Sequence, residues 1–277
     1  MIQEYANCFD LQCLLDQRSS LGQEEARIIV RQIAKGVQHL ASLKILHRDL
    51  KPANIMLHFP DIPNFERLSS SEKLMFLKNV DLKRTNFSVK IADFGLSTVL
   101  DPRSSVLSIV GTPLYQAPQV LAQVYYDDSI DTWALGTILY ELLHGVTPFH
   151  CPDEEQLMNK MKEGRYKVRS NGEPISIEAC LFLLECLQIH EEDRIDVDLL
   201  LSSPFINEAL SGVKLHELDH ATFTQELQAE NAKQEDCDSS DESIESPLTR
   251  NTEKLTCSEN EIDLTIKPSL MREVLVR

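Results

Sequence analysis

The chain has 277 residues, of which 42% are hydrophobic, so it can bury a core in one large domain or two smaller ones. Its net charge of −17 argues against nucleic-acid binding, no run of 18 apolar residues predicts an integral membrane segment, and residues 1–4 lack the features of a secretory signal. Seven scattered cysteines without a Cys-x-x-Cys pair favour a reducing setting, and we expect a cytoplasmic protein.

The start of the chain predicts an extended piece and then two helices. Residues 3–7 are expected to be extended, and residues 10–15 have the pattern of a short amphipathic helix. Taken alone, they indicate an edge strand and a surface helix. Between residues 21 and 43, apolar residues recur every three or four positions, which predicts a long helix with Glu24 and Glu25 in its first turns, where the helix dipole favours acids.

The most informative stretch is residues 47–54, His-Arg-Asp-Leu-Lys-Pro-Ala-Asn, which lies between two short apolar runs that predict small strands. A loop held by strands at both ends keeps its side chains in fixed positions, as phosphoryl transfer requires. In such a reaction Asp49 can accept a hydroxyl proton, Lys51 can contact the transferring phosphate, and Asn54 can offer an oxygen to a metal ion.

Residues 58–88 contain two prolines, three successive serines and mixed charges. We expect mainly an exposed loop there, with a short helix over residues 72–80. Two interpretations stay open: a surface insertion without function, or a docking site for a regulatory protein. A strand is predicted next, over residues 89–91, and Asp-Phe-Gly follows it at residues 93–95.

The second half of the chain predicts further helices. Residues 129–143 are apolar on nearly every face, which indicates a buried helix, and Gly145 is a natural stop after it. Shorter helices are expected near residues 154–162, 177–187 and 197–201.

A tail is predicted from residue 207 onward. Residues 207–277 hold 16 acidic and seven basic residues, and the part from Gln234 to Pro247 is acidic and serine-rich with nothing to bury. We expect this tail to be mostly disordered, with one helix around residues 219–233. It is either a plain solvated tail or one that carries phosphorylation sites and contacts a regulatory partner.

Taken together, the motifs at 47–54, 93–95, 111–119 and 131–136, with Arg194, resemble those of the eukaryotic serine/threonine protein kinases. The resemblance implies an α+β, protein-kinase-like fold over residues 1–206, mainly its helical C-terminal lobe. It also implies transfer of the γ-phosphoryl group of ATP, with Mg²⁺, to serine and threonine hydroxyls of protein substrates. Several features, including the insertion before the strand at residues 89–91, look like the autophagy-initiating kinases.

The resemblance assigns roles to the residues of the catalytic loop. It implies that Asp49 is the catalytic base and works with Lys51, and that Asn54 and Asp93 hold Mg²⁺. The hydroxyl of Thr112 is expected to bond to the catalytic Asp and Lys.

The resemblance also implies a nucleotide site. Residues 3–7 correspond to the hinge, so backbone groups near Glu4 and Ala6 are expected to bond to adenine, and Met56 is expected to lie beneath the base. The phosphate end of ATP is expected near three polar residues, Lys51, Asn54 and Asp93.

Three supporting contacts follow from the same resemblance. Gln119 stands where the family has Glu and is expected to bond to Arg194, more weakly than a carboxylate does. Asp131 is expected to hold the backbone of the catalytic loop. A phosphate on the serines and threonines between residues 97 and 112 is expected to pair with Arg48.

The 277 residues contain no G-x-G-x-x-G. We therefore expect that the N-terminal lobe, with its glycine-rich loop, strand lysine and helix glutamate, is missing from the sequence. Two classes of function stay open: an active serine/threonine kinase of which this sequence is a part, and a non-catalytic, kinase-like binding module or inactive fragment. Intact Asp49, Lys51, Asn54 and Asp93 favour the first.

Overall fold

The computed structural model describes residues 4–100, 111–151, 153–164, 166, 168 and 175–207. Gln3, the serines at 104, 105 and 108, and the tail beyond Asn207 fall outside this part, so the expectations for them stay predictions. None of the helices in the described ranges is both long and apolar enough to cross a membrane. The cysteines within those ranges are free thiols: Cys8, Cys13, Cys151, Cys180 and Cys186.

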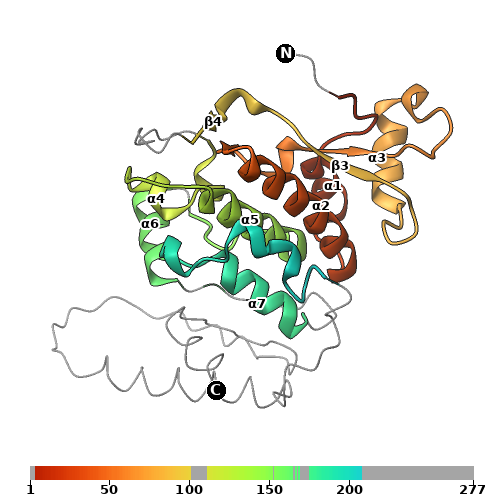
Figure 1. Ribbon diagram of the computed structural model, residues 1–277. Helices are drawn as coiled ribbons and strands as arrows, with labels where there is room; N and C mark the ends of the chain where they lie inside the picture. Colours follow the sequence, from red (N-terminus) through yellow and green to blue (C-terminus); the bar gives the residue numbers. More distant parts are fainter. Residues whose placement is uncertain are drawn as a thin grey trace, which may run out of the picture.

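The described residues are mainly helical (Figure 1). The helices are α1 (Leu11–Arg18), α2 (Gln23–Ser42), α3 (Ser70–Asn79), α4 (Pro118–Leu121), α5 (Ser129–His144), α6 (Glu154–Glu163) and α7 (Ile177–Cys186). The strands are β1 (Ile45–Leu46), β2 (Ile55–His58), β3 (Ser88–Ile91) and β4 (Thr98–Val99). These bounds confirm the expected helices to within a few residues, except that the last one, η6 (Val197–Ser202), is a 3₁₀-helix.

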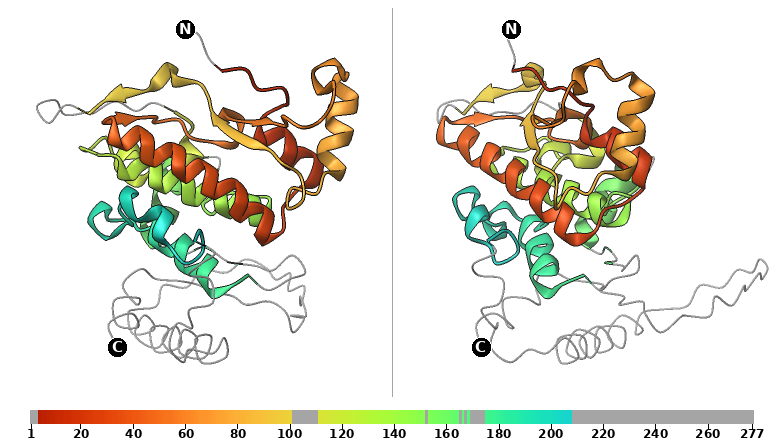
Figure 2. Two further views of the ribbon diagram at one scale, coloured as in Figure 1. Left: turned by 45° about the vertical axis from the view of Figure 1, so that its right-hand side comes forward. Right: turned by 90° about the vertical axis from the view of Figure 1, so that its right-hand side faces the viewer.

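Helix α5 forms the centre of the molecule, between α2 and α7 (Figures 1 and 2). Its residues from Ile130 to Leu143 are all buried, as expected for a helix that is apolar on nearly every face. A Cβ atom at Gly136 would lie 2.5 Å from Cβ of Cys186, so α5 and α7 approach closely at this point. The helix ends at Gly145, whose positive φ of 75° suits a glycine.

Two small antiparallel sheets lie at the level of the catalytic loop. β1 pairs with β4, and β2 pairs with β3 with Met56 opposite Lys90. The two strands that flank residues 47–54 thus belong to different sheets, and the loop connects them. Residues 8–10 run beside β2, because the amide of Cys8 donates to the carbonyl of Leu57 at 3.2 Å and the amide of Leu57 donates to the carbonyl of Phe9 at 3.0 Å.

The segment at residues 58–88 contains the short helix expected there and is exposed at most of its positions, but it also has a buried core that the sequence did not indicate. Helix α3 occupies ten of these residues and begins with a capping box between Ser69 and Glu72. Four aromatic rings with centroids 4.9–5.9 Å apart form a cluster under it: Phe59, Phe65, Phe76 and Phe87. The free energy gained by burying these rings outweighs the preference of the prolines and serines between them for a loop. Helix α3 packs against α1 (Figure 1).

Candidate active site

The backbone of the catalytic loop is held from below by helix α5. Asp131, in the first turn of α5, accepts the amide of His47 at 2.8 Å and the amide of Arg48 at 3.1 Å. Burial raises the pKa of Asp131, and the two donated N–H groups oppose that rise because they favour the carboxylate. The grip expected from the sequence is thus present, and it keeps Arg48 in a left-handed conformation with φ of 68°.

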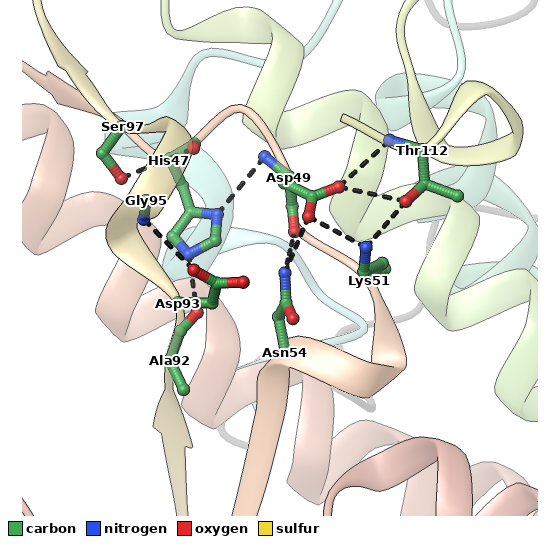
Figure 3. Close-up of polar contacts among 9 residues, drawn as sticks. All are labelled: His47, Asp49, Lys51, Asn54, Ala92, Asp93, Gly95, Ser97 and Thr112. Carbon is green, nitrogen blue, oxygen red and sulfur yellow. Dashed lines mark hydrogen bonds and ion pairs between the residues drawn. The ribbon is translucent and has the colours of Figure 1, made fainter. Parts of the chain in front are cut away.

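The carboxylate of Asp49 accepts hydrogen bonds from four groups (Figure 3). Oδ1 accepts the amide of Thr112 at 3.0 Å and its hydroxyl at 3.1 Å. Oδ2 accepts Nδ2 of Asn54 at 3.0 Å and lies 2.9 Å from Nζ of Lys51. Since the side chain of Asp49 is only 8% exposed, these donors keep a carboxylate in one position at the edge of the interior.

Lys51 and Thr112 complete the cluster. Nζ of Lys51 donates to the hydroxyl of Thr112 at 2.8 Å while it pairs with Asp49, as the resemblance implied. Gly111 has a φ of 108°, and a Cβ atom there would lie 2.6 Å from the carbonyl oxygen of Arg48. Only glycine fits such a place without strain, so Gly111 allows Thr112 to approach the loop.

Asn54 is oriented as a ligand through its oxygen. Its Nδ2 donates both to the carboxylate of Asp49 and, at 2.8 Å, to the backbone carbonyl of Asp49. With the nitrogen used in this way, Oδ1 is turned away from Asp49 (Figure 3) and can bind a hard cation.

Asp93 follows β3 on the other side of this region. It has a left-handed backbone with φ of 62°, its Oδ1 accepts the amide of Gly95 at 3.2 Å, and its side chain is exposed. His47 links the two segments: its Nδ1 accepts the amide of Asp49 at 3.4 Å, its Nε2 lies 3.0 Å from the carbonyl of Ala92, and its ring meets the edge of Phe94. These bonds require the proton on Nε2.

The oxygen atoms of Asn54 and Asp93 fit Mg²⁺, which is usually held by one or two carboxylates together with phosphates and water. No cluster of three His, Cys, Asp or Glu side chains able to hold a metal occurs among the described residues. A magnesium ion that arrives with a nucleotide does not need such a cluster.

The residues expected to hold the adenine lie in or near the β2–β3 sheet. Burial alternates along β2, with Ile55 and Leu57 in the core and Met56 on the more exposed side. Lys90 is opposite Met56 and forms an ion pair with Glu4 at 2.8 Å, which lowers the pKa of Glu4. Glu4 and Met56 are thus both neighbours of Lys90, Glu4 through the ion pair and Met56 across the strand pair. Ala6 is half-buried two residues further along, and the bonds of both backbones to adenine stay predictions.

The bond expected between Gln119 and Arg194 is present. Nη2 of Arg194 donates to Oε1 of Gln119 at 3.2 Å, and Nε2 of Gln119 donates to the carbonyl of Ile189 at 2.6 Å, a bond that a glutamate does not make. Burial lowers the pKa of Arg194 to about 10, and its guanidinium lies over the ring of Trp133. Gln119 therefore accepts a hydrogen bond from Arg194 and donates one to Ile189.

Two further contacts were not expected from the sequence. The hydroxyl of Tyr115 donates to Oε2 of Glu141 at 2.6 Å, which ties the segment after Thr112 to α5, and no pattern in the sequence links these two residues. The backbone and side chain of Asn7 form hydrogen bonds with residues in the segment 58–88. Only the Ser-x-x-Glu start of α3, a capping box, offered a signal that this segment is folded.

Comparison with known proteins agrees with this geometry. The sequence profile of the protein kinase domain matches residues 1–206. The chain belongs to the protein kinase family. Several of the proteins to which it is similar are serine/threonine kinases.

Three of these relatives come from distant organisms. The chain is 30% identical to serine/threonine-protein kinase ULK1 of Homo sapiens over 207 residues. The aligned region covers 75% of this chain and 18% of that protein. The chain is also 30% identical to serine/threonine-protein kinase unc-51 of Caenorhabditis elegans and 29% identical to serine/threonine-protein kinase atg1 of Schizosaccharomyces pombe, over 76% and 67% of this chain. These matches span 23% and 22% of the two relatives, so the similarity covers less than a quarter of each of the three proteins.

Proposed function

We propose that this kinase transfers the γ-phosphoryl group of ATP to serine or threonine hydroxyls of protein substrates. The observation that carries the proposal is the carboxylate of Asp49, which Lys51, Asn54 and Thr112 hold in one place. A base fixed in this way can receive the proton of a substrate hydroxyl as the hydroxyl attacks phosphorus.

The neighbours of Asp49 have distinct tasks in this proposal. The ammonium group of Lys51 lies beside Asp49 and offers positive charge to the transferring phosphate. Asn54 and Asp93 are the residues that would hold Mg²⁺, which neutralises charge on the phosphates of bound ATP. Thr112 keeps Asp49 and Lys51 at a fixed separation, so positioning and charge stabilisation come from the same cluster.

Replacement of Asp49 by asparagine tests the proposal. Asp49→Asn keeps the size of the side chain and removes the base, so we expect phosphoryl transfer in the active kinase to fall by about 10²–10⁴-fold. Asp198→Asn, an exposed carboxylate on η6, is the control and should leave the rate unchanged. Unchanged turnover of Asp49→Asn would show that another group acts as the base.

Activity also requires groups that cover and bind the phosphates of ATP. The 277 residues contain no G-x-G-x-x-G, and the side chain of Asp93 is exposed. We therefore propose that turnover requires a glycine-rich loop and a strand lysine in addition to residues 1–277. The absence of this N-terminal lobe from the sequence remains a prediction. If no such lobe restores transfer, the second candidate, a kinase-like binding module, is favoured.

The cellular setting is a further part of the proposal. Similarity to atg1 and unc-51 supports a role in autophagy or related signalling, and the free cysteines fit a cytoplasmic location. A regulatory protein is proposed to bind through the folded segment at residues 58–88 or through the acidic tail. Co-purification of the full chain from cells, with and without residues 208–277, distinguishes these two surfaces.

A further inference from the structure

Every polar group of Asn7 is bonded to the segment at residues 58–88. The backbone amide donates to Nδ1 of His58 at 3.3 Å, and the backbone carbonyl accepts Nζ of Lys73 at 2.8 Å. The side chain makes a reciprocal pair with Phe59: Nδ2 donates to the Phe59 carbonyl at 2.9 Å and Oδ1 accepts the Phe59 amide at 2.8 Å. Asn7 is 7% exposed, so these partners replace water almost completely.

The segment that supplies these partners is itself fixed. Nζ of Lys73 lies 5.4 Å from the centre of the Phe65 ring, which belongs to the buried aromatic cluster. The far end of the segment is tied to α1 and α2, because Arg18 pairs with Glu25 and also donates to the carbonyl of Val80 at 3.2 Å. A segment anchored at both ends does not behave as a free surface loop.

Asn7 directly follows the residues proposed to bond to adenine. Ala6 precedes it, and residues 8–10 run beside β2, the strand that carries Met56. A displacement of Asn7 therefore moves the backbone of Ala6 relative to Met56. Figure 1 shows α3 beside this first part of the chain, next to α1.

We propose that residues 58–88 are a built-in support for residues 4–7, the proposed adenine-binding segment, with Asn7 and Lys73 as positioning residues. This inference rests on the proposed function, because it assigns the nucleotide site to residues 4–7. In this proposal the segment acts within the chain and sets the affinity for ATP, in addition to any contact with a regulatory protein. The ammonium group of Lys73 matters most, since it is a charged donor to a buried carbonyl.

Hydrogen exchange of backbone amides tests the support without any need for activity. In the 277-residue chain, Lys73→Met keeps the apolar stem over Phe65 and removes the donated bond, so exchange of the amides of residues 7–10 should speed up by about tenfold. Lys73→Arg restores a charged donor and should return exchange toward the wild-type rate. Lys78→Met, on an exposed position of the same helix, is the matched control and should change nothing. Equal exchange in Lys73→Met and wild type would overturn the inference.

Kinetics of the active kinase provide the second readout. Lys73→Met should raise the KM for ATP by about 3- to 10-fold, with kcat and the KM for a peptide substrate unchanged, because residues 4–7 are loosened and the catalytic loop is not. A fall in kcat with an unchanged KM for ATP would contradict a positioning role. If the wild-type kinase transfers no phosphate, the proposed function fails, and the exchange experiment still decides whether residues 58–88 support the start of the chain.

Discussion

Buried Glu141 and half-buried Tyr115 form a pair that makes the stability of the protein depend on pH. Burial raises the pKa of Glu141 above its ordinary value of 4.5, although the bond donated by Tyr115 opposes the rise. The folded state therefore binds a proton at Glu141 more tightly than the unfolded state does. Its contribution to stability is present below pH 4.5 and is lost as the pH rises through the raised pKa.

Glu141→Gln removes this dependence and keeps an oxygen that accepts the Tyr115 hydroxyl. We expect the melting temperature of the variant relative to wild type to increase with pH above 4.5 and then to level off. Thermal unfolding between pH 4 and 8 measures the difference. A difference that stays constant over that range would mean that Glu141 has the same pKa in the folded and unfolded states.

Single residues of the catalytic loop were predictable because their spacing is tied to one task. Asp49, Lys51 and Thr112 meet as the motifs implied. Asn7 was not predictable, since its partners are 51 to 66 positions away in a segment whose composition indicates a loop. An amide that bonds to distant backbone groups leaves no periodic signal in the sequence.

The close approach of α5 to α7 at Gly136 provides a test of how the helices pack. Gly136→Ala would place a Cβ atom 2.5 Å from Cβ of Cys186 and 3.2 Å from the side chain of Leu187. Neither backbone can retreat without disturbing the core, so we expect a loss of about 1–3 kcal/mol in the free energy of unfolding.

Denaturant unfolding of Gly136→Ala measures this loss. The control is Gly22→Ser, because Gly22 precedes α2 with open space around it, and a serine at the N-cap should be neutral or slightly stabilising. Equal stability of Gly136→Ala and wild type would show that α5 and α7 are further apart than described here.

The long helices and the short helix within residues 58–88 were predicted, but the aromatic cluster of that segment was not. Helix α2 and helix α5 follow from their apolar patterns, which extend over 20 and 16 residues. The phenylalanines of residues 58–88 are spread among prolines and serines, so no periodicity marks them as a core. The 3₁₀ form of η6 also escaped prediction, because short apolar runs do not distinguish it from an α-helix.

Contacts with several parts of the molecule hold the catalytic loop in one conformation. Its flanking strands β1 and β2 join separate sheets, and Asp131 holds the loop from α5, so three parts of the molecule converge on Asp49. The sequence predicted the two strands around the loop and the strand at residues 89–91, but not β4, because β4 has only two residues. Pairing of such short strands is decided by the rest of the fold.

Transfer of phosphate from ATP to a serine/threonine peptide, with Mg²⁺, tests the central claim most directly. The assay compares residues 1–277 alone, the same residues joined to a small lobe with a glycine-rich loop and a strand lysine, and the joined form with Asp49→Asn. We expect no useful turnover from the first, phosphorylation by the second, and a rate about 10²–10⁴-fold lower in the third. Comparable turnover by residues 1–277 alone, or by the Asp49→Asn form, would contradict it.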